Sequence, residues 1–254
     1  MRVIAGVARG FPLKGPPGPA TRPTSDKVRG AIFDALAPRL AEARVLDLYA
    51  GTGALGIEAL SRGATSCLFV EKAAAVCRVI EANLRATKLS DNALVWSSTV
   101  EKALERLESP TPHLPTWEEP ATAVAWQTTG AAAPKNGATE RLAQLHKHPI
   151  PDRSRRRSAM RPRSQAIRAE GIPPPFDPPY DILILDPPYD DLGIADVIER
   201  ISRPGLVARG GFVVLEHGKR WAPPPDPGVV RLRRTRLYGD TGVTLWQREE
   251  EAEE

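Results

Sequence analysis

Apolar and polar residues repeat along the chain in patterns that predict where helices and strands lie. Between residues 43 and 107, short apolar runs predict buried strands, and apolar residues three or four positions apart predict helices. The strands are predicted at 45–48, 66–71 and 93–96, and the helices at 54–62, 73–87 and 100–107. Strands and helices that alternate at this length indicate a parallel sheet with helices on both faces.

The same pattern resumes after residue 180 and then ends in strands alone. The continuous apolar run 182–185 predicts a central buried strand. A helix, a further strand and the two strands of a closing hairpin are predicted at 191–202, 206–216, 229–238 and 241–247. The fold class is therefore predicted to be α/β, with a core at 45–108 and 177–248 built on a doubly wound sheet of seven strands.

The first 44 residues are predicted to form a hairpin followed by a helix. The strands of the hairpin are predicted at 2–6 and 11–14, and the helix begins at Thr24 or Ser25, either of which can cap it. The apolar side of this helix carries Val28, Ile32, Phe33 and Leu36. Three polar residues lie away from the apolar side and are candidates to line a site: Arg22, Thr24 and Arg29.

Residues 109–176 follow neither repeat and are predicted to be a disordered insertion. The segment has eleven prolines and few apolar residues, so it cannot bury enough apolar surface to order itself. Its basic run at 153–163 allows two interpretations, nonspecific contact with RNA or DNA and a plain solvated linker. Its histidines have no companion ligands, so no metal site is predicted at His113, His146 or His148. The acidic end, 249–254, is predicted to be a solvated tail.

The charge of the chain is uneven, although the net value is only +4. Residues 1–44 carry eight lysines and arginines against three acids, and residues 218–248 carry seven against two. Basic segments at both ends of a catalytic core suit an anionic polymer, although ordinary solubilising charge would give the same counts. No uncharged apolar run reaches 18 residues, so we expect no membrane span. Cys67 and Cys77 are interpreted as buried thiols of a cytoplasmic protein.

A glycine-rich turn joins the predicted strand 45–48 to the next helix. Its glycines, between positions 51 and 56, fit the dinucleotide template G-x-G-x-x-G, which is weak evidence by itself. Asp47 favours a different ligand, because a carboxylate repels a pyrophosphate but attracts a cationic amine. Glu71 ends the following strand, at a position where an acidic residue can accept both hydroxyls of a ribose.

This combination resembles the S-adenosylmethionine site of Rossmann-like methyltransferases, and a purely structural strand, turn and helix is the alternative. Hydroxyl residues at 97–99 follow the third predicted strand, where the adenine of such a cofactor is expected. The residues expected to bind the cofactor are Thr24, Asp47, Ala50, Gly51, Thr52, Gly53, Glu71, Ser98 and Thr99.

A second motif, Asp186-Pro187-Pro188-Tyr189, directly follows the fourth predicted strand and so emerges at the same edge of the sheet. The exocyclic amine of a nucleobase is a poor nucleophile, because its lone pair is delocalised into the ring. Asp186 and the Pro187 carbonyl can accept both amine hydrogens, so that the lone pair points at a sulfonium methyl. Tyr189 offers a face on which a flipped base stacks, and the prolines remove competing N–H donors. The same letters at 177–180 precede a strand and are interpreted as structural.

The two motifs, together with Arg2–Gly6, Arg9-Gly10 and Arg22–Arg29, closely resemble the bacterial 16S rRNA guanine-N2 methyltransferases of the RsmD type. The resemblance implies a Rossmann-like class I S-adenosylmethionine-dependent methyltransferase that methylates the N2 amine of one guanine. It implies S-adenosylmethionine as cofactor, 16S rRNA or the assembling small ribosomal subunit as partner, and a monomer without a metal. The implied catalytic residues are Asp186, Pro187, Pro188 and Tyr189. The implied substrate-binding residues are Arg9, Arg22, Arg29 and Tyr189.

Other activities are compatible with the same motifs. A DNA adenine or cytosine amino-methyltransferase can share the second motif, as can an enzyme acting on another RNA base. DNA enzymes usually carry a separate target-recognition region, and the insertion is too poor in apolar residues to be one. A protein-glutamine methyltransferase would be expected to have Asn at position 186. An inactive RNA-binding module would have no need of Asp47 and Asp186 together.

Overall fold

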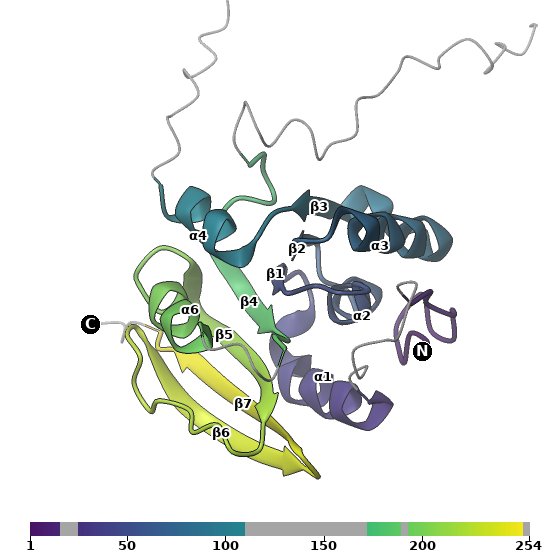
Figure 1. The fold of residues 1–254 in the computed structure, drawn as a ribbon. Coiled ribbons are helices and arrows are strands. Elements are labelled where there is room, and N and C mark those ends of the chain that lie inside the picture. The colour runs from purple at the N-terminus through teal and green to yellow at the C-terminus, as the bar shows by residue number, and fades with distance from the viewer. Residues whose placement is uncertain (16–24, 110–171, 189–192, 251–254) are drawn as a thin grey trace, which may run out of the picture. The chain divides into compact units, whose positions relative to one another are not determined.

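Seven strands form one sheet in the order β3-β2-β1-β4-β5-β7-β6 (Figure 1). The first five strands pair in parallel, whereas β7 runs antiparallel to both of its neighbours, β5 and β6. The strands are β1 (Arg44–Leu48), β2 (Ser66–Glu71), β3 (Ala93–Ser97), β4 (Tyr180–Leu185), β5 (Val207–Gly218), β6 (Val230–Tyr238) and β7 (Thr241–Arg248). The predicted doubly wound, seven-stranded sheet is therefore confirmed.

The computed structural model describes residues 1–15, 25–109, 172–188 and 193–250. All of these belong to one of two compact units, the unit formed by 1–110 and 161–254. Most of the predicted insertion, with its three histidines, lies outside the described residues, as does the tail from residue 251. Three residues predicted for the site also lie outside them: Arg22, Thr24 and Tyr189.

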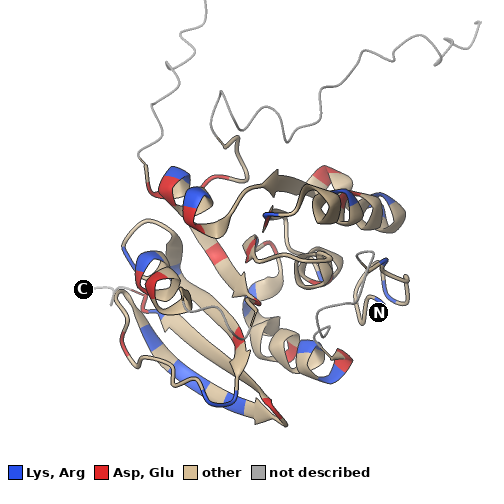
Figure 2. Ribbon diagram, viewed as in Figure 1, with Lys and Arg blue, Asp and Glu red and all other residues tan. Residues whose placement is uncertain are grey.

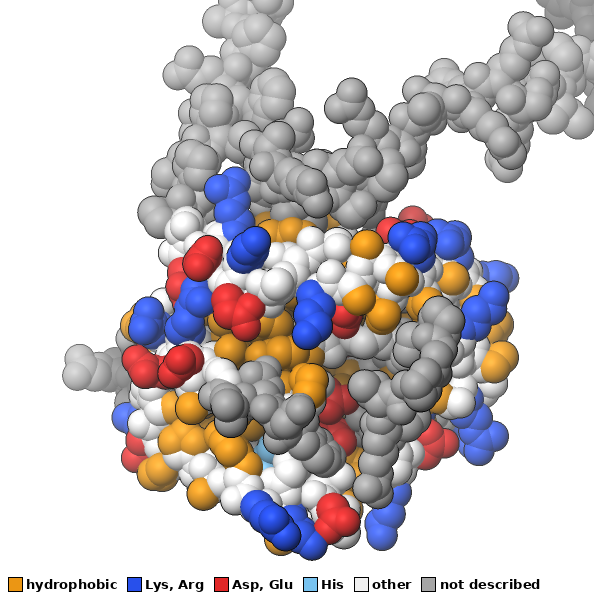
Figure 3. All heavy atoms as spheres, in the orientation of Figure 1, with side chains coloured by type: hydrophobic (Ala, Val, Ile, Leu, Met, Phe, Trp, Pro, Cys, Tyr) orange, Lys and Arg blue, Asp and Glu red, His pale blue; other side chains and the backbone are white. Residues whose placement is uncertain are grey.

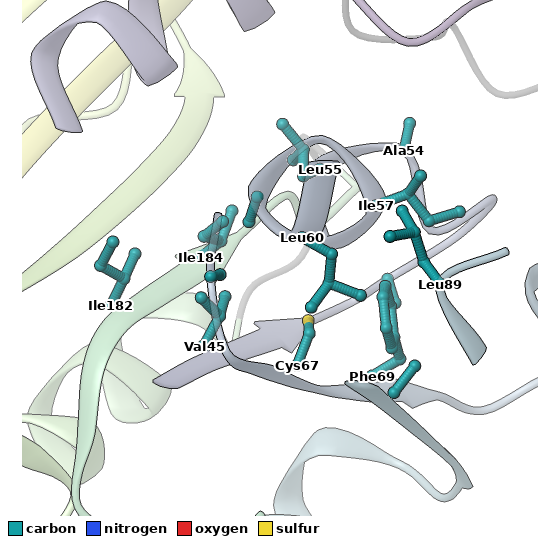
Figure 4. Packing of buried hydrophobic residues seen from close by; sticks show 14 of the residues in the cluster. Val45, Ala54, Leu55, Ile57, Leu60, Cys67, Phe69, Leu89, Ile182 and Ile184 are labelled. Carbon is teal, nitrogen blue, oxygen red and sulfur yellow. The ribbon is translucent and has the colours of Figure 1, made fainter. Parts of the chain in front are cut away.

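Helices cover both faces of the sheet and bury a separate apolar cluster on each. The helices are α1 (Asp26–Leu40), α2 (Ala54–Ser61), α3 (Ala74–Thr87), α4 (Val100–Glu108) and α6 (Ile194–Ile201), with a single 3-10 turn η1 (Ser90–Asn92). α1, α2 and α3 pack on one face, and α4 and α6 on the other. Figure 4 shows the apolar side chains of α2 lying over Val45, Cys67 and Phe69 of the sheet. Within the described ranges, no helix is long and apolar enough to cross a membrane.

The N-terminal segment, residues 1–15, doubles back on itself as predicted and packs on α2, but its antiparallel pairing is shorter than the strands predicted at 2–6 and 11–14. The two halves pair around a bridge between Arg2 and Pro12, where the Val3 N–H donates to the Phe11 carbonyl (3.0 Å) and the Leu13 N–H to the Met1 carbonyl (3.0 Å). The backbone of the segment is bound by α2: the Glu58 carboxylate accepts from the N–H groups of Ile4 (2.7 Å) and Ala5 (2.9 Å). Glu58 thereby satisfies the N–H groups of the two residues that directly follow the paired part of the segment.

Gly6 explains how the segment can approach α2 so closely. Its φ is +80°, and a Cβ atom at this position would lie 1.8 Å from the Ser61 carbonyl oxygen. The Ser61 hydroxyl accepts from the Ala8 N–H (2.9 Å) and donates to the Ala5 carbonyl (2.6 Å). The segment therefore belongs to the core unit, held by polar contacts with a wholly buried helix.

Arg29 does not line a site, contrary to the prediction. Its side chain is wholly buried, donates to the Arg2 carbonyl and pairs with Asp26 (3.0 Å). Burial lowers the pKa of its guanidinium, and the charges of Glu58 and Asp26 oppose this shift. The N-terminal segment covers the side of α1 that the amphipathic pattern assigned to solvent, and this is why Arg29 is buried. Arg29 in turn connects the segment to α1.

The C-terminal boundary of the predicted insertion is also wrong. Ile172 and Phe176 are buried in the cluster beneath α4 and α6, so the last residues of 109–176 belong to the core. Tyr180 is buried as well and donates its hydroxyl to the Phe176 carbonyl (2.5 Å). Asp177 pairs with Arg44 at the start of β1 (2.9 Å), which confirms that the first Asp-Pro-Pro-Tyr sequence is structural.

Candidate functional site

The two predicted motifs begin at neighbouring points of the sheet. Leu48, the last residue of β1, pairs in register with Leu185, the last residue of β4. The chain leaves β1 toward β2 and β3 on one side and leaves β4 toward β5 on the other. The two strands thus form the topological switch point, where ligands bind at the carboxyl edge of doubly wound sheets. The glycine turn and Asp186 start side by side at this edge.

The glycine turn after β1 uses left-handed backbone conformations. Tyr49, Gly51 and Gly53 have φ values of 59°, 53° and 76°. Gly53 caps the N-terminus of α2, and a Cβ atom there would lie 2.9 Å from the Ile80 side chain. A Cβ atom at Gly51 would find only one atom within 4 Å, so its α-carbon faces open space. The turn therefore offers backbone without side chains to a ligand at the helix N-terminus.

Gly56 has a different purpose, which is the packing of α2 on β2. A Cβ atom at this position would lie 2.3 Å from the Phe69 ring and 2.7 Å from the Cys67 sulfur. Its φ is not positive, so conformation does not require glycine there. The third glycine of the turn is thus needed for contact between helix and sheet.

Asp47 is buried beneath the turn and is 1% exposed. Its Oδ2 accepts from the Gly56 N–H (2.9 Å), so the carboxyl group holds the first turn of α2. Its Oδ1 is buried and has no hydrogen-bond partner in the described part of the chain. Burial raises the pKa of Asp47 to about 8, the charges of Asp186 and Glu71 raise it further, and the Gly56 N–H opposes them. Direct contact of Asp47 with a cationic amine remains a prediction.

Glu71, at the end of β2, faces the same turn. Its Oε2 accepts from the Gly51 N–H (3.0 Å), and its Oε1 accepts from the Ala73 N–H (2.8 Å). Each carboxylate oxygen can accept a second hydrogen bond, so both remain able to receive a hydroxyl. Glu71 thereby ties the turn after β1 to the end of β2 and keeps its acceptors at the carboxyl edge.

Three carboxyl groups therefore gather at one place: Asp47, Glu71 and Asp186. Figure 3 shows acidic side chains near the centre of the face turned to the reader, with hydrophobic side chains next to them. Such a site attracts a cation and accepts hydrogen bonds from amines and hydroxyls. Among the described residues, no group of three or more acidic, histidine or cysteine side chains is placed to hold a metal ion.

The second motif extends from β4 at this edge. Asp186 is partly exposed, Pro187 is buried and Pro188 is exposed. Asp47 lies opposite Ile184 of β4, two residues before Asp186, and the charge of Asp186 raises the pKa of Asp47. Tyr189 lies outside the described residues, so its predicted stacking role stays a prediction.

The hydroxyl residues after β3 have separate contacts. The Ser98 N–H donates to the Glu71 carbonyl (3.1 Å), which places Ser98 beside the end of β2. The Thr99 hydroxyl accepts from the Lys102 N–H (3.4 Å) and caps α4. The Ser98 hydroxyl donates to the Thr99 carbonyl (3.1 Å). Both residues thus have structural contacts that the sequence interpretation did not include, and their contact with a cofactor stays a prediction.

Asn83 of α3 was not predicted, yet it supports the glycine turn directly. Its side-chain amide donates to the Thr52 carbonyl (3.0 Å) and to the Lys14 carbonyl (3.1 Å). Its Oδ1 accepts from the Lys14 N–H (2.8 Å). A buried Asn among the apolar positions of an amphipathic helix was the available signal. Arg9 is exposed on the N-terminal segment, and its predicted contact with substrate stays a prediction.

Comparison with known proteins was made against a family model, curated proteins and solved structures. A model of the family described as "Conserved hypothetical protein 95" matches residues 1–115 and 161–247. "Putative rRNA methyltransferase YlbH" of Bacillus subtilis is 28% identical over 248 residues, covering 98% of this chain and 99% of that protein. "Ribosomal RNA small subunit methyltransferase D" of Escherichia coli is 42% identical over 110 residues, which cover 43% of this chain and 55% of that protein.

The structure of "Putative methyltransferase yhhF" from Escherichia coli superposes with a TM-score of 0.65 at 25% identity and covers 99% of both chains. Together with the strand order and the antiparallel β7, this likeness confirms the predicted class I methyltransferase fold.

Proposed function

Since the chain belongs to the Conserved hypothetical protein 95 family, we propose that it is an S-adenosylmethionine-dependent rRNA methyltransferase. We further propose that the acceptor is the exocyclic N2 amine of a guanine in small-subunit rRNA. The names of the two curated relatives support rRNA as the substrate. The choice of guanine N2 rests on the motifs that resemble the RsmD type.

The site has features that suit a sulfonium cofactor. Bare backbone at Gly51 and Gly53 lets a ligand approach the N-terminus of α2. Glu71 keeps acceptor capacity for ribose hydroxyls, and the gathered carboxyl groups favour a positive charge. S-adenosylmethionine, when bound, supplies a methyl group on a positively charged sulfur. The residues proposed to hold it are Asp47, Ala50, Gly51, Thr52, Gly53, Glu71 and Ser98, with Thr24 and Thr99 as further candidates.

Asp186 and Pro187 are proposed to prepare the acceptor amine. The Asp186 carboxylate and the Pro187 carbonyl would accept the two amine hydrogens and turn the nitrogen lone pair toward the glycine turn. Pro187 and Pro188 have no N–H donors that could compete for these oxygens. The amine becomes strongly acidic only after methylation, so no strong base is needed before transfer.

The pairing of Leu48 with Leu185 carries this proposal, because it brings the glycine turn and Asp186 to one edge of the sheet. The test is transfer of a labelled methyl group to naked 16S rRNA, assembled small subunits or DNA, followed by analysis of the nucleosides. We expect label in N2-methylguanosine from one of the two ribosomal substrates. Label in a methylated adenine or cytosine of DNA would show that the chain is an amino-methyltransferase of a different class.

A further inference from the structure

β6 is the edge strand of the sheet, and it carries four arginines and no acidic residue. All four are exposed: Arg231, Arg233, Arg234 and Arg236. They are called the β6 arginine surface below. Figure 2 shows blue along most of β6, whereas the neighbouring strands are largely tan.

A β-bulge puts the four arginines on one face of the sheet. Arg231 pairs with Gln247, and the register shifts between Leu232 and Arg234. After the shift, Arg234 lies opposite Leu245 and Arg236 opposite Val243. Side chains directly opposite each other in an antiparallel pair share a face, and strict alternation without a bulge would have divided these arginines between both faces.

The contacts of the bulge complete this arrangement. Arg233, the extra residue, donates from its Nε to Gln247 Oε1 (3.1 Å), so it reaches toward the residue opposite Arg231. Leu245 and Val243 pack with the cluster beneath α1, which identifies the face as the one that α1 covers. The surface is therefore basic on the α1 side of the sheet, and Thr235 and Leu237 point to the other side.

The strand β6 runs toward the edge of the sheet at which the proposed site lies. β6 and β5 both run antiparallel to β7, so β6 runs in the same direction as β4 and β5 (Figure 1). Its C-terminal end consequently lies at the carboxyl edge of the sheet, the edge at which Asp186 follows β4. From Arg231 to Arg236 the strand spans about 17 Å at its usual rise per residue, a length that covers several phosphates of one nucleic-acid strand.

The arginines are poorly neutralised within the chain. Arg231 lies 3.5 Å from Asp226, a pair exposed to solvent and hence weak, and Arg233 contacts the neutral Gln247. The side chains of Arg234 and Arg236 take part in no hydrogen bond or ion pair within the described residues. Guanidinium groups with free N–H donors match the geometry of phosphate oxygens.

We propose that the β6 arginine surface binds the phosphate backbone of the RNA whose base enters the proposed site. This inference rests on the proposed function, because it takes RNA as the substrate. Protection of an edge strand against pairing with other strands would also favour charged residues. The bulge already disrupts such pairing, and edge protection does not require all four charges on one face.

The test compares two double variants that remove the same charge. Arg234→Gln with Arg236→Gln removes the two unpaired arginines of the surface. Arg85→Gln with Arg203→Gln is the control and removes two exposed arginines outside β6. Arg85 lies beside Glu81 of the same helix, α3, and Arg203 follows α6 and lies beside Glu199 of that helix. Binding of fluorescently labelled 16S rRNA is measured from low to high salt, alongside kcat and KM for methyl transfer and the thermal transition.

For the first pair, we expect an RNA affinity about tenfold lower at low salt and a salt slope shallower by about 0.7 to 0.9 for each phosphate that the variant no longer neutralises. KM for RNA should rise while kcat at saturation stays within twofold. Arg234→Lys with Arg236→Lys should restore most of the slope, because it keeps the charge. An RNA affinity and a salt slope equal to those of the Arg85 and Arg203 variant would overturn the inference. It would also be overturned if the Arg234 and Arg236 variant bound RNA normally and bound an acidic protein more weakly, because the surface would then serve a protein partner.

Failure of the proposed function gives a different result. If the unaltered protein transfers methyl groups to DNA and none to rRNA, the substrate assignment is wrong whatever the arginine variants do. If it methylates rRNA and the variants bind RNA normally, only the β6 arginine surface is wrong.

Discussion

The carboxyl groups of Asp47 and Asp186 lie close enough that the charge of Asp186 raises the pKa of Asp47. One residue belongs to β1 and the other follows β4, and 138 residues lie between them along the chain. Their proximity follows from the parallel pairing of the two strands, in which Asp47 is opposite Ile184. Within this pair, Asp47 is buried and holds α2, whereas Asp186 is partly exposed and is the residue proposed to contact the acceptor amine.

Replacing Asp186 with alanine should separate transfer from cofactor binding. We expect methyl transfer to be abolished, because the acceptor amine no longer has the carboxylate that orients it. Affinity for the cofactor, measured by calorimetry, should stay within a few fold. Loss of cofactor binding in this variant would mean that Asp186 belongs to the cofactor site.

Asp47→Asn should change how stability depends on pH. The folded carboxyl group has a pKa of about 8 and an ordinary value of 3.8. Between these values the folded state holds a proton that the unfolded state has released, so this group makes the free energy of unfolding fall as pH rises from about 4 to 8. Asn keeps an oxygen for the Gly56 N–H and removes the titration.

The variant should therefore gain stability relative to the unaltered protein by a few kcal/mol across this range, as measured by urea unfolding at a series of pH values. A difference that does not vary with pH would show that Asp47 is ionised in the folded protein at neutral pH. In contrast, Asp47→Ala removes the contact with Gly56, and we expect it to weaken cofactor binding before it affects transfer.

Gly6 and Gly10 form a matched pair that tests how tightly the N-terminal segment packs. Their φ values are +80° and +85°, but a Cβ atom at Gly6 would meet Ser61 and one at Gly10 would meet nothing within 4 Å. Gly10→Ala should cost about 1–2 kcal/mol from conformation alone. Gly6→Ala should cost clearly more and expose the segment to proteolysis. Equal costs for the two variants would show that the segment does not press against α2.

Shortening the insertion should leave the fold intact if the cut avoids the core. Deletion of 116–160, the part that the family model omits, should change the midpoint of thermal unfolding by only a few degrees. Deletion of 112–174 also removes Ile172, whose absence from the core costs about 2–5 kcal/mol, and should lower the midpoint by at least about 5 °C. Loss of a cooperative transition in the shorter deletion would place 116–160 in the folding unit.

Features of the fold and of the candidate site that depend on the spacing of nearby residues could be predicted from the sequence. The apolar runs located the strands, and the glycine turn and Asp186-Pro187 could be placed at strand ends because each motif directly follows its strand. Arg29 was misplaced, because a charged residue off the apolar side of a helix is usually exposed. Its burial depends on a segment that packs from elsewhere in the chain.

Other features had no local signal. Ile172 and Phe176 are two apolar residues among prolines and give no repeat, so their burial could not be foreseen. The paired part of the predicted hairpin ends early, at Val3, and the N–H groups of Ile4 and Ala5 donate instead to Glu58, more than fifty positions away. The bulge after Leu232 likewise depends on the register with β7, so the positions of the arginines in the sequence could not predict it.

Asn83 links the N-terminal segment to the glycine turn. Its amide side chain is hydrogen-bonded to both the Lys14 backbone and the Thr52 carbonyl, so a displacement of one of them strains the bond to the other. A substitution that shifts the backbone at Lys14 should therefore also shift Thr52 in the turn that follows β1. The beginning of the chain is thus coupled, through a single buried amide, to the proposed cofactor site.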